Sequence, residues 1–98
     1  MNLSEMNKNC EEVAEVLKAL AHKQRLMILC HLADCEKTVG ELHELCEISP
    51  SYTSQFLNRM KREGLVSSTR EGNFTYYSLT DPKVLKLIKS LHIIFNTD

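Results

Sequence analysis

The sequence has 98 residues, of which 43% are hydrophobic, and a net charge of −1. A chain of this length forms one domain with a small core, so burial against a second subunit would add stability. No stretch reaches the roughly 18 to 20 apolar residues of a membrane span, and the polar, acidic N-terminus is unlike a secretion signal. We therefore expect one cytoplasmic domain over residues 1–98, with reduced cysteines and no membrane partner.

The charge is unevenly distributed along the chain. Residues 1–47 hold five Lys or Arg and nine Asp or Glu, whereas residues 48–98 hold seven and four. The first half is therefore net acidic and the second half net basic. Phosphate groups are attracted by a local positive face rather than by the total charge, so we expect any contact with nucleic acid to come from the second half.

Two helices are predicted in the first third of the chain. Ser4 is the expected N-cap of the first, whose apolar residues recur every three or four positions and form one stripe: Met6, Cys10, Val13, Leu17 and Leu20. The second is predicted over residues 22–33 and is apolar enough to occupy the centre of the core.

A short helix, a turn and a longer helix are predicted next. Thr38 and Glu41 have the spacing of a capping box, which starts a helix of about two turns ending near Cys46. Ser49 followed by Pro50 is a strong helix start, because proline at the first position lacks only an N–H that would have no partner there. This fourth helix is predicted to reach residue 63, where Gly64 can supply a left-handed stop.

The periodicity then changes from helical to alternating. Residues 65–70 and 74–79 are rich in β-branched and aromatic types and predict a β-hairpin. Asp81-Pro82 starts a last helix, and eight of the fourteen residues 83–96 are Val, Leu, Ile or Phe, too many for one face of a solvent-exposed helix. The predicted fold is mainly α with a β-hairpin wing, a winged helix-turn-helix.

The fourth helix carries the residue types that read DNA. Five polar side chains fall on one of its faces because their spacing is i, i+3, i+4, i+7 and i+11: Ser51, Ser54, Gln55, Asn58 and Arg62. Gln and Asn can form paired hydrogen bonds with adenine, and Arg59, Lys61 and Arg62 can contact phosphates. In the hairpin, Arg70, Asn73 and Thr75 can lie along a DNA backbone or in a minor groove. An ordinary solvated helix face and surface hairpin are the alternative interpretation.

Four segments together resemble the ArsR/SmtB family of winged-helix regulators: LKALAHKQRLMILCHLAD (17–34), VGEL (39–42), SPSYTSQFLNRMKREGLV (49–66) and REGNFTYYSL (70–79). The resemblance implies a homodimer through the first and last helices, a fourth helix in the major groove and a wing. By position, Ser54 and Gln55 match the family's Ser-Gln recognition pair and Ser51 its earlier serine. Pro50 and Phe56 depart from the Gln and His that are common there.

NLSEMNKN (2–9), LMILC (26–30) and SLHIIF (90–95) are similar to the HlyU-like, sulfur-sensing (BigR/SqrR-type) branch of that family. In that branch, a cysteine at the position of Cys30 pairs with a second cysteine on the last helix, where this chain has Asn96. Cys30 could be a packed structural thiol, which its apolar helix favours, a single-thiol sensor, or a switch that recruits Cys10.

The family's metal sites are poorly matched, so we predict no metal and no cofactor. Glu41-Leu42 is followed by His43, Glu44 and Leu45 rather than by a Cys-x-Cys. A metal-responsive repressor using His43 and Cys46 with another cysteine stays an alternative.

No catalytic constellation is present, so an enzyme is not predicted. The predicted function is a sequence-specific DNA-binding regulator, a repressor or anti-silencer on a palindromic operator, with an unidentified effector and a possible redox response through Cys30. A winged-helix module that docks a protein partner is the alternative from another class.

Overall fold

The computed structural model describes residues 2–96. In this part of the chain, the elements are α1 (Leu3–Leu20), α2 (Lys23–Asp34), β1 (Lys37–Thr38), α3 (Val39–Cys46), α4 (Pro50–Arg62), β2 (Val66–Glu71), β3 (Phe74–Leu79) and α5 (Pro82–Phe95). This order confirms the predicted winged helix-turn-helix and adds the short strand β1. None of the described helices is long and apolar enough to cross a bilayer.

The helix starts depend on local side-chain caps. The prediction of Ser4 as the first N-cap is wrong: Asn2 Oδ1 accepts the backbone N–H groups of Ser4 and Glu5 at 3.1 and 3.2 Å. Ser4 lies inside the helix because Asn2 already accepts its N–H. His22 precedes α2 as its N-cap rather than belonging to the helix. The capping box of Thr38 is present as predicted.

The three strands form one antiparallel sheet in the order β1-β3-β2. β2 and β3 are the predicted hairpin, with Val66 opposite Leu79 and Glu71 opposite Phe74. β1 was not predicted, because two residues are too few to show a period. In its pairing with β3, Thr38 lies opposite Tyr76. Because Thr38 is also the N-cap of α3, this pairing joins the start of α3 to the wing.

The core lies between α2, α3, α4 and the start of α5. Its largest fully buried apolar side chains come from these four helices: Ile28, Leu29, Leu42, Leu57, Met60 and Val84. The prediction that α2 occupies the core centre is confirmed by Ile28 and Leu29. Each of these six side chains contributes about 1.5–3 kcal/mol of burial free energy, which fixes the helices relative to one another.

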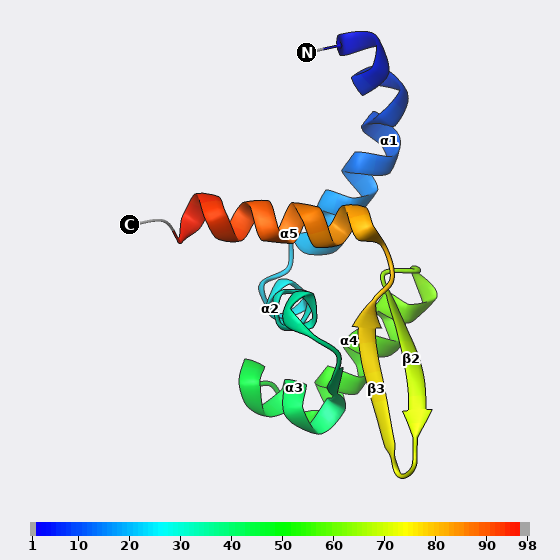
Figure 1. Cartoon of the computed structure of the whole chain (residues 1–98), viewed down its shortest axis with the longest axis vertical. Coiled ribbons are helices and arrows are strands. Elements are labelled where there is room, and N and C mark those ends of the chain that lie inside the picture. Colours follow the sequence, from blue (N-terminus) through cyan, green and yellow to red (C-terminus); the bar gives the residue numbers. More distant parts are fainter. Residues whose placement is uncertain (1, 97–98) are drawn as a thin grey trace.

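The elements separate into two groups around α2. α5 crosses above α2 and α1 projects away beyond it, whereas α3 and the wing extend on the other side (Figure 1). The predicted stripe of α1 is largely exposed, with Leu17 at 50%, and the end of α5 exposes Phe95 at 78%. The two helices that the family resemblance assigns to the dimer interface, α1 and α5, therefore expose apolar side chains.

Candidate DNA-binding surface

The recognition helix α4 starts and ends on local signals in the sequence. The backbone N–H of Tyr52 donates to Ser49 Oγ at 3.1 Å, and Thr53 Oγ1 donates to the Ser49 carbonyl oxygen at 2.8 Å. At the other end, Gly64 has φ +78°, the left-handed conformation that ends a helix at little cost for glycine. The predicted extent to residue 63 is close to the observed one, in which Glu63 is the C-cap.

α4 has one buried face and one exposed face. Thr53, Leu57 and Met60 are fully buried against the core. The opposite face presents Ser51, Gln55, Asn58, Arg59 and Arg62 to solvent, and Ser54 is half-buried at its edge. The structure thus brings the predicted polar residues together on one accessible surface, with hydrogen-bonding groups toward the start of the helix and positive charge toward its end.

The helix-turn-helix connection is short and has one unusual residue. Glu47, after α3, has φ 54° and ψ 45°, a left-handed conformation that the sequence did not indicate. The N–H of Ile48 then donates to the His43 carbonyl oxygen at 3.2 Å, which closes the end of α3. This turn directs the chain from α3 into Ser49 and Pro50.

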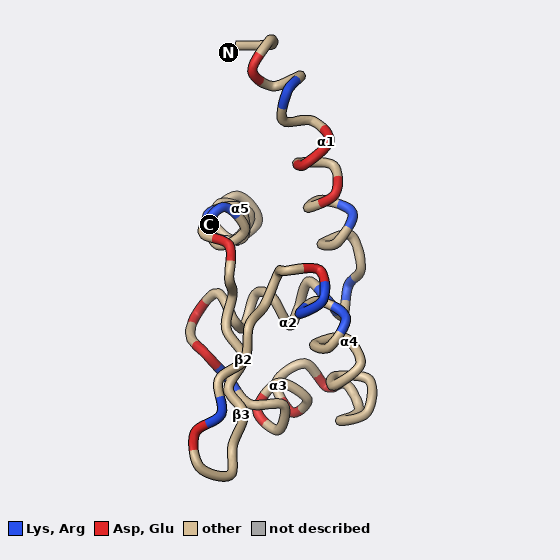
Figure 2. The backbone as a smooth tube through the Cα atoms, turned by 90° about the vertical axis from the view of Figure 1, so that its right-hand side faces the viewer, with Lys and Arg blue, Asp and Glu red and all other residues tan. Residues whose placement is uncertain are grey.

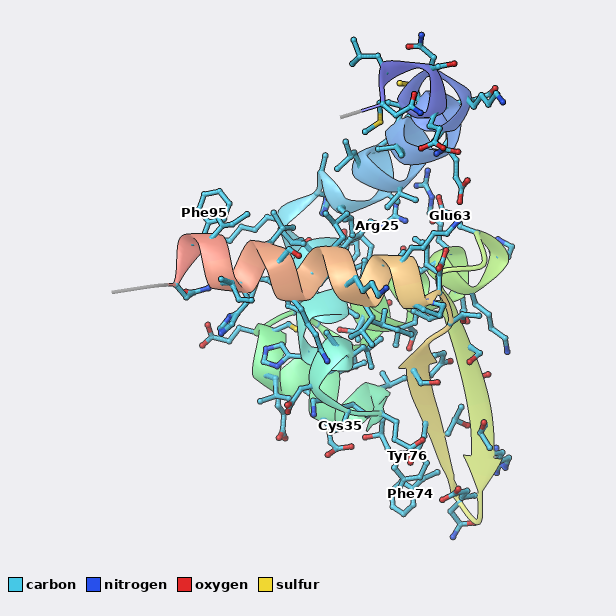
Figure 3. All side chains as sticks on the ribbon, turned by 45° about the horizontal axis from the view of Figure 1, so that its top comes forward. Arg25, Cys35, Glu63, Phe74, Tyr76 and Phe95 are labelled. Carbon is cyan, nitrogen blue, oxygen red and sulfur yellow. The ribbon has the colours of Figure 1, made fainter. Side chains whose placement is uncertain are left out.

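Two polar contacts fix α4 to its neighbours. Lys61 Nζ donates to Ser68 Oγ at 2.6 Å, which joins α4 to β2 of the wing. Lys61, a predicted phosphate contact, is exposed and also makes this contact within the protein. Arg25 of α2, 8% exposed, forms an ion pair with Glu63, and Figure 3 shows both residues. Together, these contacts set the position of the recognition helix between α2 and the wing.

The wing carries the predicted basic and polar residues near its tip. Arg70 and Asn73 are exposed, and Gly72 with φ +62° forms the turn between them. Thr75 pairs with Arg70 and is half-buried, so less of its surface is accessible than the prediction assumed. The wing has one basic residue, Arg70, next to Glu71, and Figure 2 shows acidic and basic segments alternating along α1. The positive charge of this surface therefore comes mainly from Arg59 and Arg62 at the end of α4 rather than from the wing.

Exposed aromatic residues beside this surface were missed by the sequence analysis. Phe74 and Tyr52 are both 60% exposed, the first near the wing tip and the second near the start of α4. The Tyr52 ring lies 6.4 Å from that of Phe56, which lies 5.3 Å from the ring of His22. Phe56 thus packs the start of α4 against the start of α2. The exposed fraction of an aromatic residue depends on tertiary packing, so no sequence signal distinguished these two.

Three of the four cysteines, Cys10, Cys30 and Cys35, are exposed, and Cys46 is buried. Cys30 is exposed, which corrects the interpretation favoured by its apolar helix, a packed structural thiol. The reason is that α5 covers the neighbouring face of α2 and leaves a groove of about 810 Å³, lined by Cys30 and Asn96 among others. Partial burial in this groove raises the pKa of the Cys30 thiol. Cys10 is exposed on α1 and does not line the groove, and Cys46 is buried.

A metal site is not assembled within residues 2–96. No group of three or more His, Cys, Asp or Glu side chains in this range is close enough to hold a metal ion. The set considered from the sequence, His43 and Cys46 with Cys30 or Cys35, is thus not brought together by the fold.

Comparison with known proteins identifies the family. Residues 22–68, which include the helix-turn-helix, match the family described as bacterial regulatory protein, arsR family. The transcriptional activator HlyU of Vibrio cholerae is 42% identical over 95 residues, covering 97% of this chain and 88% of HlyU. The chain belongs to the arsR family. As a member of its HlyU-like branch, it is a DNA-binding, winged-helix transcriptional regulator, as the sequence predicted.

Two solved structures share the architecture of this chain. The transcriptional repressor BigR from Xylella fastidiosa superposes with a TM-score of 0.92 at 36% identity, with 100% of both chains covered. A homodimeric winged helix-turn-helix DNA-binding domain, Mb0332 from Mycobacterium bovis, has a TM-score of 0.76 at 31% identity and covers 92% of this chain and 83% of its own. The relatives that share this architecture thus include both an activator and a repressor.

Proposed function

We propose that this arsR-family member binds a palindromic operator as a homodimer in the cytoplasm and regulates transcription without enzymatic activity. The observation that carries the proposal is the exposed polar face of α4, held in place by three fully buried side chains and flanked by the wing. Gln55 and Asn58 lie on that face as base-reading groups, and Arg59, Arg62 and Arg70 lie around it as phosphate contacts.

The homodimer is supported by uncovered apolar surface on two helices. On α1 the exposed fractions of Met6, Val13 and Leu17 are 44%, 40% and 50%, and on α5 Ile93, Ile94 and Phe95 are exposed as well. Exposed apolar side chains that gather on particular helices mark interaction surfaces. The homodimeric state named for Mb0332 agrees with this arrangement. Two copies of α4 would then enter successive major grooves about 34 Å apart, which requires a palindromic site.

Replacing Gln55 or Asn58 with alanine tests the base-reading role. Each replacement should lower the preference for operator over random DNA by about 1–3 kcal/mol, or roughly 5- to 150-fold, with little loss of non-specific binding. Fluorescence anisotropy with both DNAs measures the ratio. Gln24→Ala, which truncates an exposed glutamine on α2, is the matched control. Equal losses on operator and random DNA would contradict the assignment.

Replacing Arg62 or Arg70 with alanine tests the phosphate contacts. Binding should weaken on every DNA sequence, and the slope of log K against log salt concentration should fall by about 1 for each replacement. Titrations over a series of salt concentrations give the slope. Lys86→Ala removes an exposed charge from α5 and should leave the slope unchanged. A slope that stays the same in both arginine variants would remove these residues from the interface.

A response to reactive sulfur through Cys30 is a second candidate function, and the position of Cys30 favours it. The thiol is exposed in a groove that it shares with Asn96, and no other cysteine lines that groove in the described part of the chain. Cys30 would therefore act as a single thiol that is persulfidated, rather than as one half of a disulfide with α5. The raised pKa of Cys30 means that less of it is thiolate at neutral pH, so its reaction should accelerate as the pH rises toward and beyond 9.

Polysulfide treatment tests this candidate. Treated protein should lose operator affinity, gain persulfide mass on Cys30 and react faster at pH 9 than at pH 7, whereas Cys30→Ser should keep its affinity. Anisotropy and peptide mass spectrometry give the two readouts, and Cys10→Ser shows whether Cys10 is required. Unchanged affinity of the fully modified wild type would mean that Cys30 does not regulate DNA binding.

A further inference from the structure

Tyr52 places a large exposed side chain in the first turn of the recognition helix. It is the third residue of α4, after Pro50 and Ser51, and 60% of its surface is exposed. In helix-turn-helix proteins, the N-terminal residues of the second helix contact the base edges of the major groove. Tyr52 is the largest exposed side chain at that end of α4.

The Tyr52 ring is held by a row of aromatic side chains. Its centroid lies 6.4 Å from that of Phe56, one helical turn further along α4, with an angle of 29° between the ring planes. The half-buried Phe56 ring in turn lies 5.3 Å from the ring of His22, the N-cap of α2. Aromatic pairs at these separations attract one another, so the Tyr52 side chain has a preferred position before any DNA is bound. A contact made by a side chain already in place costs less conformational entropy.

Tyr52 shares its side of α4 with two side chains assigned to DNA. Tyr52, Gln55 and Arg59 have the spacing i, i+3 and i+7, which puts them at neighbouring positions of one helix face, and all three are exposed. The hydrogen-bonding groups of Gln55 suit adenine, whereas the Tyr52 ring offers mainly apolar surface. The matching apolar group in the major groove is the 5-methyl group of thymine, which apolar side chains contact in protein–DNA complexes.

We propose that Tyr52 is a specificity-determining residue that reads thymine, through contact of its ring with the 5-methyl group. This role rests on the operator binding proposed above and adds a second kind of base to it. Three helical residues span about 4.5 Å and one base pair about 3.4 Å, so the thymine lies within about two base pairs of the adenine that Gln55 reads. The contact is apolar, so it does not require the phenolic hydroxyl group.

Replacing thymine with uracil tests the contact, because uracil lacks only the methyl group. The probe is the palindrome that the protein enriches from random DNA, synthesised with uracil at one thymine position of both half-sites at a time, and anisotropy gives the affinities. At one such position, the wild type should lose about 10- to 25-fold in affinity, as expected for two buried methyl groups. Tyr52→Ala should bind the thymine and uracil probes equally at that position, and Tyr52→Phe should keep the wild-type difference.

Phe74→Ala is the matched control, because Phe74 is an aromatic residue with the same exposed fraction, 60%, but lies near the wing tip (Figure 3). This variant should keep the difference between thymine and uracil. If the difference persisted in Tyr52→Ala, or vanished in Tyr52→Phe as well, the ring would not read the methyl group and the proposal would be overturned. The same conclusion follows if no thymine position is sensitive to the methyl group in the wild type.

The role of Tyr52 can fail while operator binding stands. In that case, Gln55→Ala still relaxes the preference at its own base pair, but Tyr52→Ala changes none of the differences between thymine and uracil. Failure to enrich any palindrome would instead overturn the operator binding and, with it, the role of Tyr52.

Discussion

Leu17→Glu on α1 and Ile94→Glu on α5 are each expected to convert the protein to a monomer and to weaken operator binding by a hundredfold or more. Both side chains are apolar and exposed, at 50% and 65%, on the helices assigned to the dimer interface. A carboxylate buried at an apolar interface loses its hydration without gaining a partner, which costs several kcal/mol. A monomer also loses the gain in affinity from binding both half-sites at once.

Size-exclusion chromatography with light scattering measures the oligomeric state, and anisotropy measures the affinity. Thr80→Glu adds the same charge at an exposed position in the loop before α5 and should change neither quantity. If both variants remained dimeric, the interface would lie elsewhere. A monomer with unchanged operator affinity would show that DNA binding does not depend on two copies.

Arg25→Ala is expected to lower the free energy of unfolding by about 2 kcal/mol, equivalent to a fall of roughly 10 °C in Tm for a domain of this size. Arg25 is buried and its ion pair with Glu63 joins α2 to the end of α4. The Nε–H of Arg25 is buried without an acceptor among the described residues, so the side chain is already incompletely satisfied. Glu63 is 38% exposed, which keeps the expected loss below that of a fully buried pair.

Two further variants separate charge from packing at this position. Arg25→Met keeps much of the side-chain volume and removes the charge, and Glu63→Gln keeps an acceptor for the guanidinium group. If the aliphatic stem contributes most of the stability, Arg25→Met should be close to the wild type in thermal unfolding. If the ion pair does, Arg25→Met should resemble Arg25→Ala. No change of Tm in Arg25→Ala would contradict a structural role for the contact.

Local signals made much of the fold predictable. Thr38 with Glu41 and Ser49 with Pro50 act within one helical turn, so the starts of α3 and α4 could be placed without tertiary information. β1 could not, because it exists only through its pairing with β3, about forty residues away, opposite Tyr76 and Tyr77. The ion pair between Arg25 and Glu63 could not be predicted either, because the two residues lie 38 positions apart in the sequence.

The candidate DNA-binding surface was predictable to a similar degree. Helical spacing alone placed Gln55, Asn58 and Arg62 on one face, and all three are exposed there. The environment of Cys30 was not predictable, because it depends on where α5 lies across α2. The hydrogen bond between Lys61 and Ser68 joins α4 to β2, and helical spacing could not predict that Ser68 is the partner of Lys61.

The alternative considered from the sequence, a protein-docking module, makes different predictions from those of a DNA-binding regulator. It would use the wing or α4 as a protein contact, so neutralising Arg59 and Arg62 would leave its main activity unchanged. The operator account instead requires that these charges and the polar groups beside them act on DNA together.

Selection of DNA from a random pool by the purified protein tests the central claim most directly. We predict an enriched palindrome whose half-sites are about one helical turn apart, bound by a dimer, with the preference relaxed in the Gln55→Ala and Asn58→Ala variants. Failure to enrich any motif, or enrichment that is identical in those variants, would contradict sequence reading by α4.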